Sequence, residues 1–174
     1  MLLGGLLKLG EGAEVDGLAG VARRLAGGNE ANRLTHEGFV RMAELGWESD
    51  DPSFRRHFTS RLIPDAPPEM ARDVDEAQRV SVPRDNLRAF LDFDARLDVV
   101  DDLVRVRCPV LLIHARDDRM VPIADGRHLA ERLADCRFLT VDGDNHVPVP
   151  GTADFDTTVA AVAAFLREHA PASG

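Results

Sequence analysis

The last third of this chain alternates strand patterns with helix patterns, and this alternation constrains the fold more than any other feature. Residues 109–114, Pro-Val-Leu-Leu-Ile-His, form a continuous apolar run of the length expected for a buried parallel strand. A helix is expected to begin at Pro122, and residues 137–142 read as a second strand. Strand, helix and strand in this order predict a right-handed crossover, so we expect an α/β fold with parallel strands over residues 101–174.

A final helix is expected to close this α/β region. Its apolar positions recur at steps of four, three and four residues, at Phe155, Val159, Val162 and Leu166. This spacing predicts one core-facing stripe. The preceding helix is expected to turn Ala130, Leu133 and Ala134 inward.

The first hundred residues have a different texture. Residues 1–10 are apolar and glycine-containing, which predicts a buried strand and a turn, whereas residues 11–100 are helical in pattern. The expected helix starts are Asp16, Thr35, Pro52, Pro67-Pro68 and Pro83. The side chains expected to face inward in the last three helices are Phe54, Phe58 and Leu62; Met70, Val74 and Ala77; and Leu87, Phe90 and Leu91. Short amphipathic helices in series favour a cap or lid over an independent bundle.

Composition limits the classes of function. The chain has 174 residues, 44% of them apolar, which suits one domain with a real core. A net charge of −9 argues against a nucleic-acid partner. No apolar stretch is long enough to span a membrane, and the apolar start lacks the basic region and cleavage site of a signal peptide, so we expect a cytoplasmic protein. Cys108 and Cys136 are expected to be reduced and mostly buried.

Polar side chains follow both strands of the α/β region. Asp117 and Asp118 follow the first strand, and His146 follows the second in the run Gly-Asp-Asn-His. Ligands and catalytic groups gather beyond the carboxyl ends of parallel strands, so we expect an acid and a histidine at one edge of the sheet.

These runs carry a resemblance to a known family. The segment CPVLLIHARDDRMVP, followed by a helix, the strand RFLTVD and then GDNH, resembles the C-terminal part of an α/β-hydrolase. The resemblance implies that Asp118 is the triad acid and His146 the general base, in the chain order of that fold. It also implies that residues 1–10 are the strand after the nucleophile helix and that residues 11–100 are a lid. The whole chain, 1–174, would then be one partial α/β-hydrolase domain.

The nucleophile of that family is missing from the sequence. None of the five serines has glycine at both −2 and +2, as the G-x-S-x-G elbow requires. The resemblance therefore predicts a truncated hydrolase, through a truncated gene, a misplaced start or a two-chain enzyme, and negligible esterase activity for the chain alone. Whether the nucleophile is Ser, Asp or Cys stays open, as does the substrate.

The polar residues also allow other interpretations. Asp117 could replace Asp118 as the acid, although the spacing from His114 favours Asp118. The Asp-rich run before His146 lacks the glycine and glutamate of an EF-hand loop, so we expect no metal. The acidic pair also suggests a receiver domain, but the required lysine after a later strand is absent. Four further histidines, expected at the surface or in the cap, are His36, His57, His128 and His169.

Two hypotheses follow for function. The first is a hydrolase of a small ester or related carbonyl substrate, without cofactor, that uses Asp118 and His146. The alternative is a non-enzymatic binding or regulatory module on a hydrolase scaffold. Because residues 1–10 would form an apolar sheet edge, we also expect self-association or a partner chain at that edge. The aromatic residues Trp47, Phe54, Phe58 and Phe90 are expected beneath the lid, where some of them could line a substrate pocket.

Overall fold

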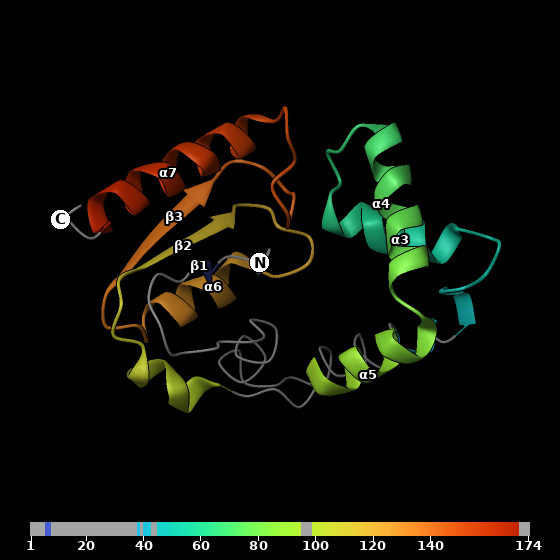
Figure 1. Cartoon of the computed structure of the whole chain (residues 1–174), viewed down its shortest axis with the longest axis horizontal. Helices are drawn as coiled ribbons and strands as arrows, with labels where there is room; N and C mark the ends of the chain where they lie inside the picture. The colour runs from blue at the N-terminus through green and yellow to red at the C-terminus, as the bar shows by residue number, and fades with distance from the viewer. Residues whose placement is uncertain (1–5, 8–37, 39, 43–44, 95–98, 171–174) are drawn as a thin grey trace.

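A computed structural model describes residues 6–7, 38, 40–42, 45–94 and 99–170 (Figure 1). The elements with stated bounds are β1 (Leu6–Leu7), α3 (Ser53–Leu62), α4 (Pro68–Ser81), α5 (Arg84–Asp94), the 3-10 helix η1 (Val100–Arg105), β2 (Val110–Ala115), α6 (Ile123–Ala130), β3 (Cys136–Val141) and α7 (Ala153–His169). The described residues among 38–46 are also helical, and the helix expected from Asp16 lies outside the described part of the chain.

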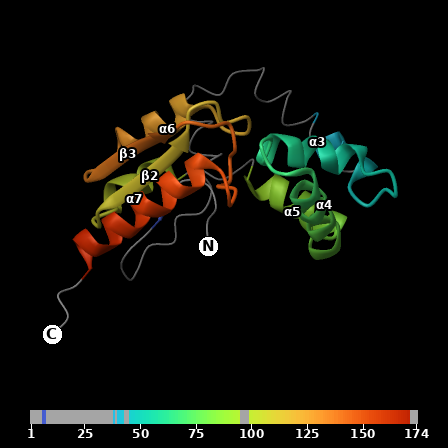
Figure 2. The same ribbon diagram turned by 90° about the horizontal axis from the view of Figure 1, so that it is seen from above.

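The expected parallel pair is present. β2 pairs in parallel with β3, in a register that runs from Val110 opposite Cys136 to Ala115 opposite Val141. The ladder continues past the strands, because Arg116 N–H donates to the Val141 carbonyl at 2.9 Å. Helix α6 connects the two strands, and Figures 1 and 2 show α6 and α7 on opposite sides of the sheet. The α/β architecture predicted for residues 101–174 is therefore confirmed.

The N-terminal strand pairs antiparallel, a direction that the sequence pattern does not predict. Leu6 and Leu7 pair antiparallel with Leu112 and Leu111 of β2, in the sheet order β1-β2-β3. The rest of residues 1–10 lies outside the described chain. A two-residue segment can pair in either direction, and the antiparallel ladder has the more favourable hydrogen bonds, so an apolar pattern alone does not decide its direction.

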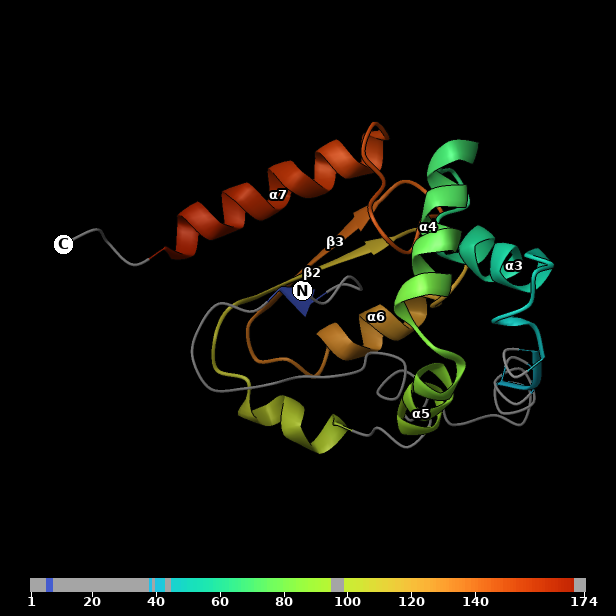
Figure 3. The ribbon, with the colours of Figure 1, turned by 45° about the vertical axis from the view of Figure 1, so that its right-hand side comes forward.

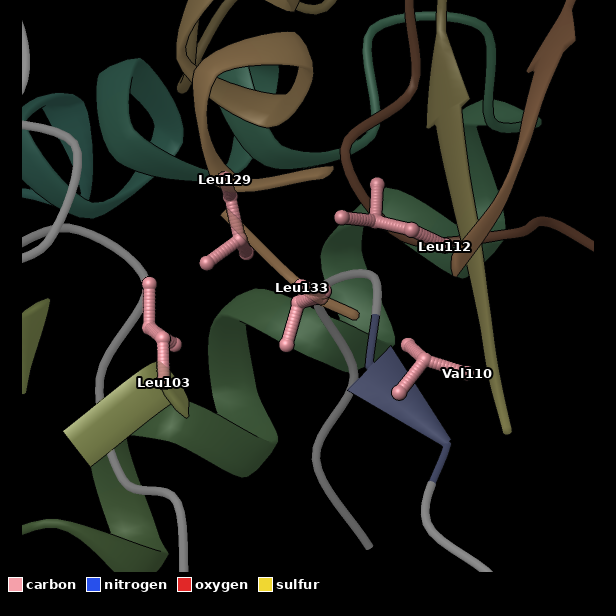
Figure 4. Packing of buried hydrophobic residues seen from close by; sticks show 5 residues of the cluster. All are labelled: Leu103, Val110, Leu112, Leu129 and Leu133. Atoms are coloured by element: carbon pink, nitrogen blue, oxygen red, sulfur yellow. The ribbon is translucent and has the colours of Figure 1, made fainter. Parts of the chain in front are cut away.

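The core of the α/β region lies between β2, η1 and α6. Figure 4 shows its buried members, Leu103, Val110, Leu112, Leu129 and Leu133. The expectation for α6 is only partly right, because this helix ends at Ala130. Leu133 is buried from the segment that follows, and Ala134, expected inward, is exposed because the helical periodicity has already stopped.

Helix α7 buries Phe165, a residue that the expected apolar stripe does not include. Phe165 is 1% exposed, whereas Val159 is 49% exposed. The centroids of the Phe165 and His169 rings lie 4.5 Å apart. The guanidinium of Arg137 on β3 lies over the Phe165 ring. Contact with β3 therefore selects the buried face of α7, and the expected stripe is wrong at Val159.

The helical region has a small core of its own. Trp47, Leu87 and Leu91 are buried, with Phe54 and Phe58 packed against them, and Trp47 Nε1 donates to the Val82 carbonyl at 2.7 Å. Helices α3, α4 and α5 begin at or next to the prolines expected to open them.

Two inward positions expected in the helical region are wrong. Phe90 is 61% exposed, and Ala77 is exposed while Asp75 of the same helix is buried. The reason in α4 is an ion pair, because Asp75 faces buried Arg55 of α3 at 3.7 Å. Hydrophobic periodicity does not register such a polar contact between helices.

The strand ends and the helical region lie near each other. In Figure 3 the arrowheads of β2 and β3 point towards α3 and α4, so the helices lie beyond the carboxyl ends of the strands. Within the described residues, no helix is long and apolar enough to cross a membrane.

Removal of a core side chain should destabilise the α/β region. Leu112 is 1% exposed at the centre of β2, so Leu112→Ala should lower the free energy of unfolding by about 2–5 kcal/mol. The matched control is Val104→Ala in η1, where the side chain is 64% exposed and the effect should stay within about 0.5 kcal/mol. Urea unfolding followed by circular dichroism measures both, and equal effects would contradict the assigned core.

Candidate acid–base site

Two loops meet at the carboxyl edge of the β2–β3 pair. The acid loop, residues 116–122, follows β2, and the base loop, residues 142–148, follows β3. They touch directly, because Asp117 N–H donates to the Gly143 carbonyl at 3.0 Å. Parallel pairing brings both loops to the same edge, as the sequence predicts.

Asp118 is the carboxylate at the centre of this contact. Its side chain is 4% exposed. Oδ1 accepts hydrogen bonds from the backbone N–H groups of Met120 and Val121, at 2.7 and 2.9 Å. Oδ2 lies 2.8 Å from Nδ1 of His146. The structure therefore places Asp118 against His146, whereas the side chain of the neighbouring Asp117 is exposed.

The charge of Asp118 is stabilised despite its burial. Desolvation raises the pKa of this carboxyl, but the hydrogen bonds from His146 and from the backbone of Val121 and Met120 lower it by more. The net effect holds the pKa of Asp118 below its ordinary value of 3.8. Asp118 is therefore ionised at neutral pH and can only accept hydrogen bonds.

This charge state determines the tautomer of His146. Since the Asp118 carboxylate can only accept, Nδ1 of His146 must carry the proton of the 2.8 Å hydrogen bond. In the neutral imidazole, Nε2 then has the free lone pair and can take a proton. The side chain of His146 is 17% exposed, and its Nε2 is not hydrogen-bonded to any residue of the described chain.

The backbone of His146 is held by the helical region. Its N–H donates to the carbonyl of Leu62 at 2.9 Å, and the N–H of Val147 approaches the same carbonyl at 3.4 Å. Leu62 is the last residue of α3. The helix thus contacts the base loop at the residue that carries the imidazole.

His114, on β2, contacts the acid loop through its side chain. Its Nε2 lies 2.9 Å from the Val121 carbonyl and 3.4 Å from Oδ2 of Asp118. Its ring stacks on Phe138 of β3, with 6.4 Å between centroids. On the other side, a Cβ at Gly126 of α6 would come within 2.5 Å of Nδ1. The sequence does not predict the contact of His114 with Asp118, because this contact depends on the path of the acid loop.

A pair of carboxyl groups, Asp144 in the base loop and Asp65 after α3, was not predicted from the sequence. Asp144 forms an ion pair with Arg119 of the acid loop. A hydrogen bond with Asp144 raises the pKa of Asp65, and desolvation and the charge of Asp144 act in the same direction. Asp65 follows α3 and lies far away in the sequence, so no spacing pattern could have joined it to Asp144.

The other predicted residues are away from this site. His57 and His128 are exposed, His169 packs on Phe165, and His36 lies outside the described chain. The four described serines make local hydrogen bonds, and none is bonded to His146: Ser49, Ser53, Ser60 and Ser81.

Both cysteines are free and half-buried in the described chain, and burial raises the pKa of the Cys136 thiol. A thiol with a raised pKa holds its proton at neutral pH. Among the described residues, no group of three His, Cys, Asp or Glu side chains could hold a metal ion.

Comparisons with known proteins identify hydrolases among the relatives. The protein named "Putative carbamate hydrolase RutD" from Caulobacter sp. (strain K31) is 31% identical, and the match covers 66% of this chain and 53% of that protein. Its namesake from Pseudomonas savastanoi pv. phaseolicola (strain 1448A / Race 6) is 37% identical over 36% of this chain and 24% of that protein. The chain thus spans about half or less of the length of these curated relatives.

A solved structure is similar as well. The crystal structure of the esterase RhEst1 from Rhodococcus sp. ECU1013 matches with a TM-score of 0.55 and 27% identity, over 73% of this chain and 46% of that one. No family model matches the sequence.

The lowered pKa of Asp118 predicts an acid-dependent loss of stability. Because the folded-state pKa lies below the ordinary value of 3.8, this contribution is complete above that pH and is lost as the pH falls through the folded-state pKa. Asp118→Asn should therefore be less stable than the wild type at neutral pH, and the difference should shrink below about pH 4. Chemical unfolding between pH 2.5 and 7 measures this difference. A constant difference across that range would contradict an ionised Asp118.

The His114 ring packs so closely against Gly126 of α6 that a larger residue at position 126 should destabilise the fold. Gly126→Ala should lower the free energy of unfolding by about 1–3 kcal/mol, because the new methyl group would overlap His114 Nδ1. The control is Gly38→Ala, also helical, where a Cβ meets nothing within 4 Å and the change should be neutral or stabilising by up to about 1 kcal/mol. Thermal unfolding compares the two, and a neutral Gly126→Ala would show that His114 can move away.

Proposed function

Because this chain is an α/β-hydrolase-like protein with part of that fold, we propose that it supplies the acid and the base of a hydrolase active site. Asp118 is the acid that orients the base, and His146 is the general base. The observation that carries the proposal is the hydrogen bond of 2.8 Å between a buried, ionised carboxylate and Nδ1 of a partly exposed imidazole. A binding module would need neither this tautomer nor this charge, so the observation favours a hydrolase over the alternative.

The proposed reaction uses His146 twice. Nε2 takes the proton of the nucleophile as the nucleophile attacks the substrate carbonyl, and it returns that proton to the leaving group. Asp118 holds the ring in the required tautomer and stabilises the imidazolium formed between the two steps. General acid–base catalysis of this kind contributes roughly 10²–10⁴-fold to the rate.

The nucleophile is proposed to come from polypeptide other than these 174 residues. None of the five serines has the G-x-S-x-G context, and the four described ones are not bonded to His146. An oxyanion hole would come from backbone N–H groups near the same elbow. The further polypeptide could be the same longer protein or a partner chain. β1 is the outer strand of the described sheet, so we propose its free edge as the place where such a chain, or a second copy, adds.

The proposed substrate is a small ester or a related carbonyl compound, such as a carbamate. Esters and carbamates share a carbonyl carbon open to attack, and the names of the similar proteins specify an esterase and carbamate hydrolases.

Residues 11–100 would serve as the lid of the domain, because α3 contacts the base loop. We place the protein in the cytoplasm, and the chemistry requires no cofactor.

The proposal makes different predictions for the chain alone and for a longer protein. The pure 174-residue chain should not turn over p-nitrophenyl acetate above the uncatalysed rate, since it lacks an oriented nucleophile. The DNA before the codon of Met1 should be sequenced. It should contain an in-frame segment that encodes G-x-S-x-G, or a gene in the same operon should encode a partner chain with this motif.

In the protein that includes this elbow, His146→Ala and Asp118→Asn should each lower kcat/KM by about 10²–10⁴-fold. His128→Ala, at an exposed histidine of α6, should leave kcat/KM unchanged. Robust turnover by the 174-residue chain that depends on His146 would overturn the proposed origin of the nucleophile. Turnover by the longer protein that survives both substitutions would overturn the assigned acid and base.

A further inference from the structure

The base loop is held from outside the sheet. Residues 142–148 contain no helix or strand, so their own backbone does not determine where His146 lies. One end is fixed at Gly143, where φ is +153° and a Cβ would lie 3.3 Å from the Asp154 carboxylate. The other end, which carries the imidazole, contacts the last residue of α3 and the segment after this helix.

Three hydrogen bonds join the base loop to the end of α3 and to the segment after it. Two are the backbone contacts of His146 and Val147 with the carbonyl of Leu62, at 2.9 and 3.4 Å. This carbonyl belongs to the last turn of α3, where helix carbonyls have no partner within the helix. The third bond runs in the opposite direction, because the N–H of Asp65 donates to Oδ1 of Asn145 at 3.0 Å.

Asn145 is the buried side chain in this connection. It is 3% exposed, and a buried amide is costly unless it is hydrogen-bonded. Its amide orientation follows from chemistry, since an N–H of the backbone requires the oxygen and not the nitrogen of the amide. Nδ2 has no hydrogen-bond partner among the described residues. The bond to Asp65 is therefore the contact that fixes this side chain.

We propose that Asn145 is a positioning residue for His146, because it fastens the base loop to the segment after α3. The proposal rests on the proposed function, in which His146 is the general base. His146 is held at two points, its ring by Asp118 and its backbone by Leu62, and Asn145 is its immediate neighbour. When the amide oxygen is lost, the Asp65 N–H is left unpaired, the loop separates from α3, and the 2.8 Å hydrogen bond to Asp118 is no longer maintained.

Nuclear magnetic resonance of the histidine ring nitrogens tests this proposal without activity. The wild-type chain should show His146 as the Nδ1–H tautomer with an Nδ1 proton protected from solvent exchange, and Asp118→Asn should abolish the protection. Asn145→Leu, which keeps the size but removes the acceptor, should also abolish it. Asn145→Asp, which keeps an acceptor for the Asp65 N–H, should restore it.

The matched control is Gln78→Leu. Gln78 is a half-buried amide whose Nε2 donates to Thr59 Oγ1 at 3.2 Å, away from the base loop, so its loss should destabilise the helices without changing the His146 signal. If Asn145→Leu does not fold, Asn145→Ser replaces it, since the hydroxyl is too short to reach Asp65.

Each result has one meaning. A protected Nδ1 proton that persists in folded Asn145→Leu overturns the positioning role and leaves the proposed function intact. Rapid hydrogen exchange of the Asp65 N–H in the wild type also overturns it. A wild-type chain with no protected Nδ1 proton, in which the Asp65 N–H is nevertheless protected, overturns the acid–base pair itself.

Discussion

The parallel pairing of β2 with β3 is the interaction on which the rest of the site depends. The register that sets Ala115 opposite Val141 makes both loops leave the sheet at the same level. Asp118 and His146 are 28 positions apart in the sequence, yet Oδ2 and Nδ1 lie 2.8 Å apart. Because side chains alternate between the faces of a sheet, a slip of one residue would turn the buried side of β3 outwards and separate the two loops.

The pairing of the two strands also supports the buried negative charge of Asp118. A carboxylate removed from water is unstable unless hydrogen bonds replace its hydration. Two backbone N–H groups and His146 supply them, and the loop that presents those N–H groups is closed by His114 bonded to the Val121 carbonyl. Gly126 leaves room for the His114 ring. The charge state of one side chain therefore depends on packing that reaches α6.

His146 is supported differently from Asp118. Asp118 is fixed by its own loop and by β2, whereas His146 depends on the end of α3, through Leu62 and through the contact of Asn145 with Asp65. The helical region contacts both loops of the site, because Arg61 of α3 also donates to the carbonyl of Arg119 in the acid loop.

The sequence by itself predicted the α/β region and the two residues, Asp118 and His146, that the structure brings together at its edge. Local signals carried this information: buried apolar runs for the strands, prolines at helix starts, and polar residues directly after each strand. Only the tertiary structure decided the direction of β1, the exposure of Phe90 and Val159, and the burial of Asp75 against Arg55. It also decided which polar groups support Asp118 and His146, since Asn145 reaches Asp65 across 80 positions. Such contacts depend on how separate elements pack, and a pattern confined to one segment does not record them.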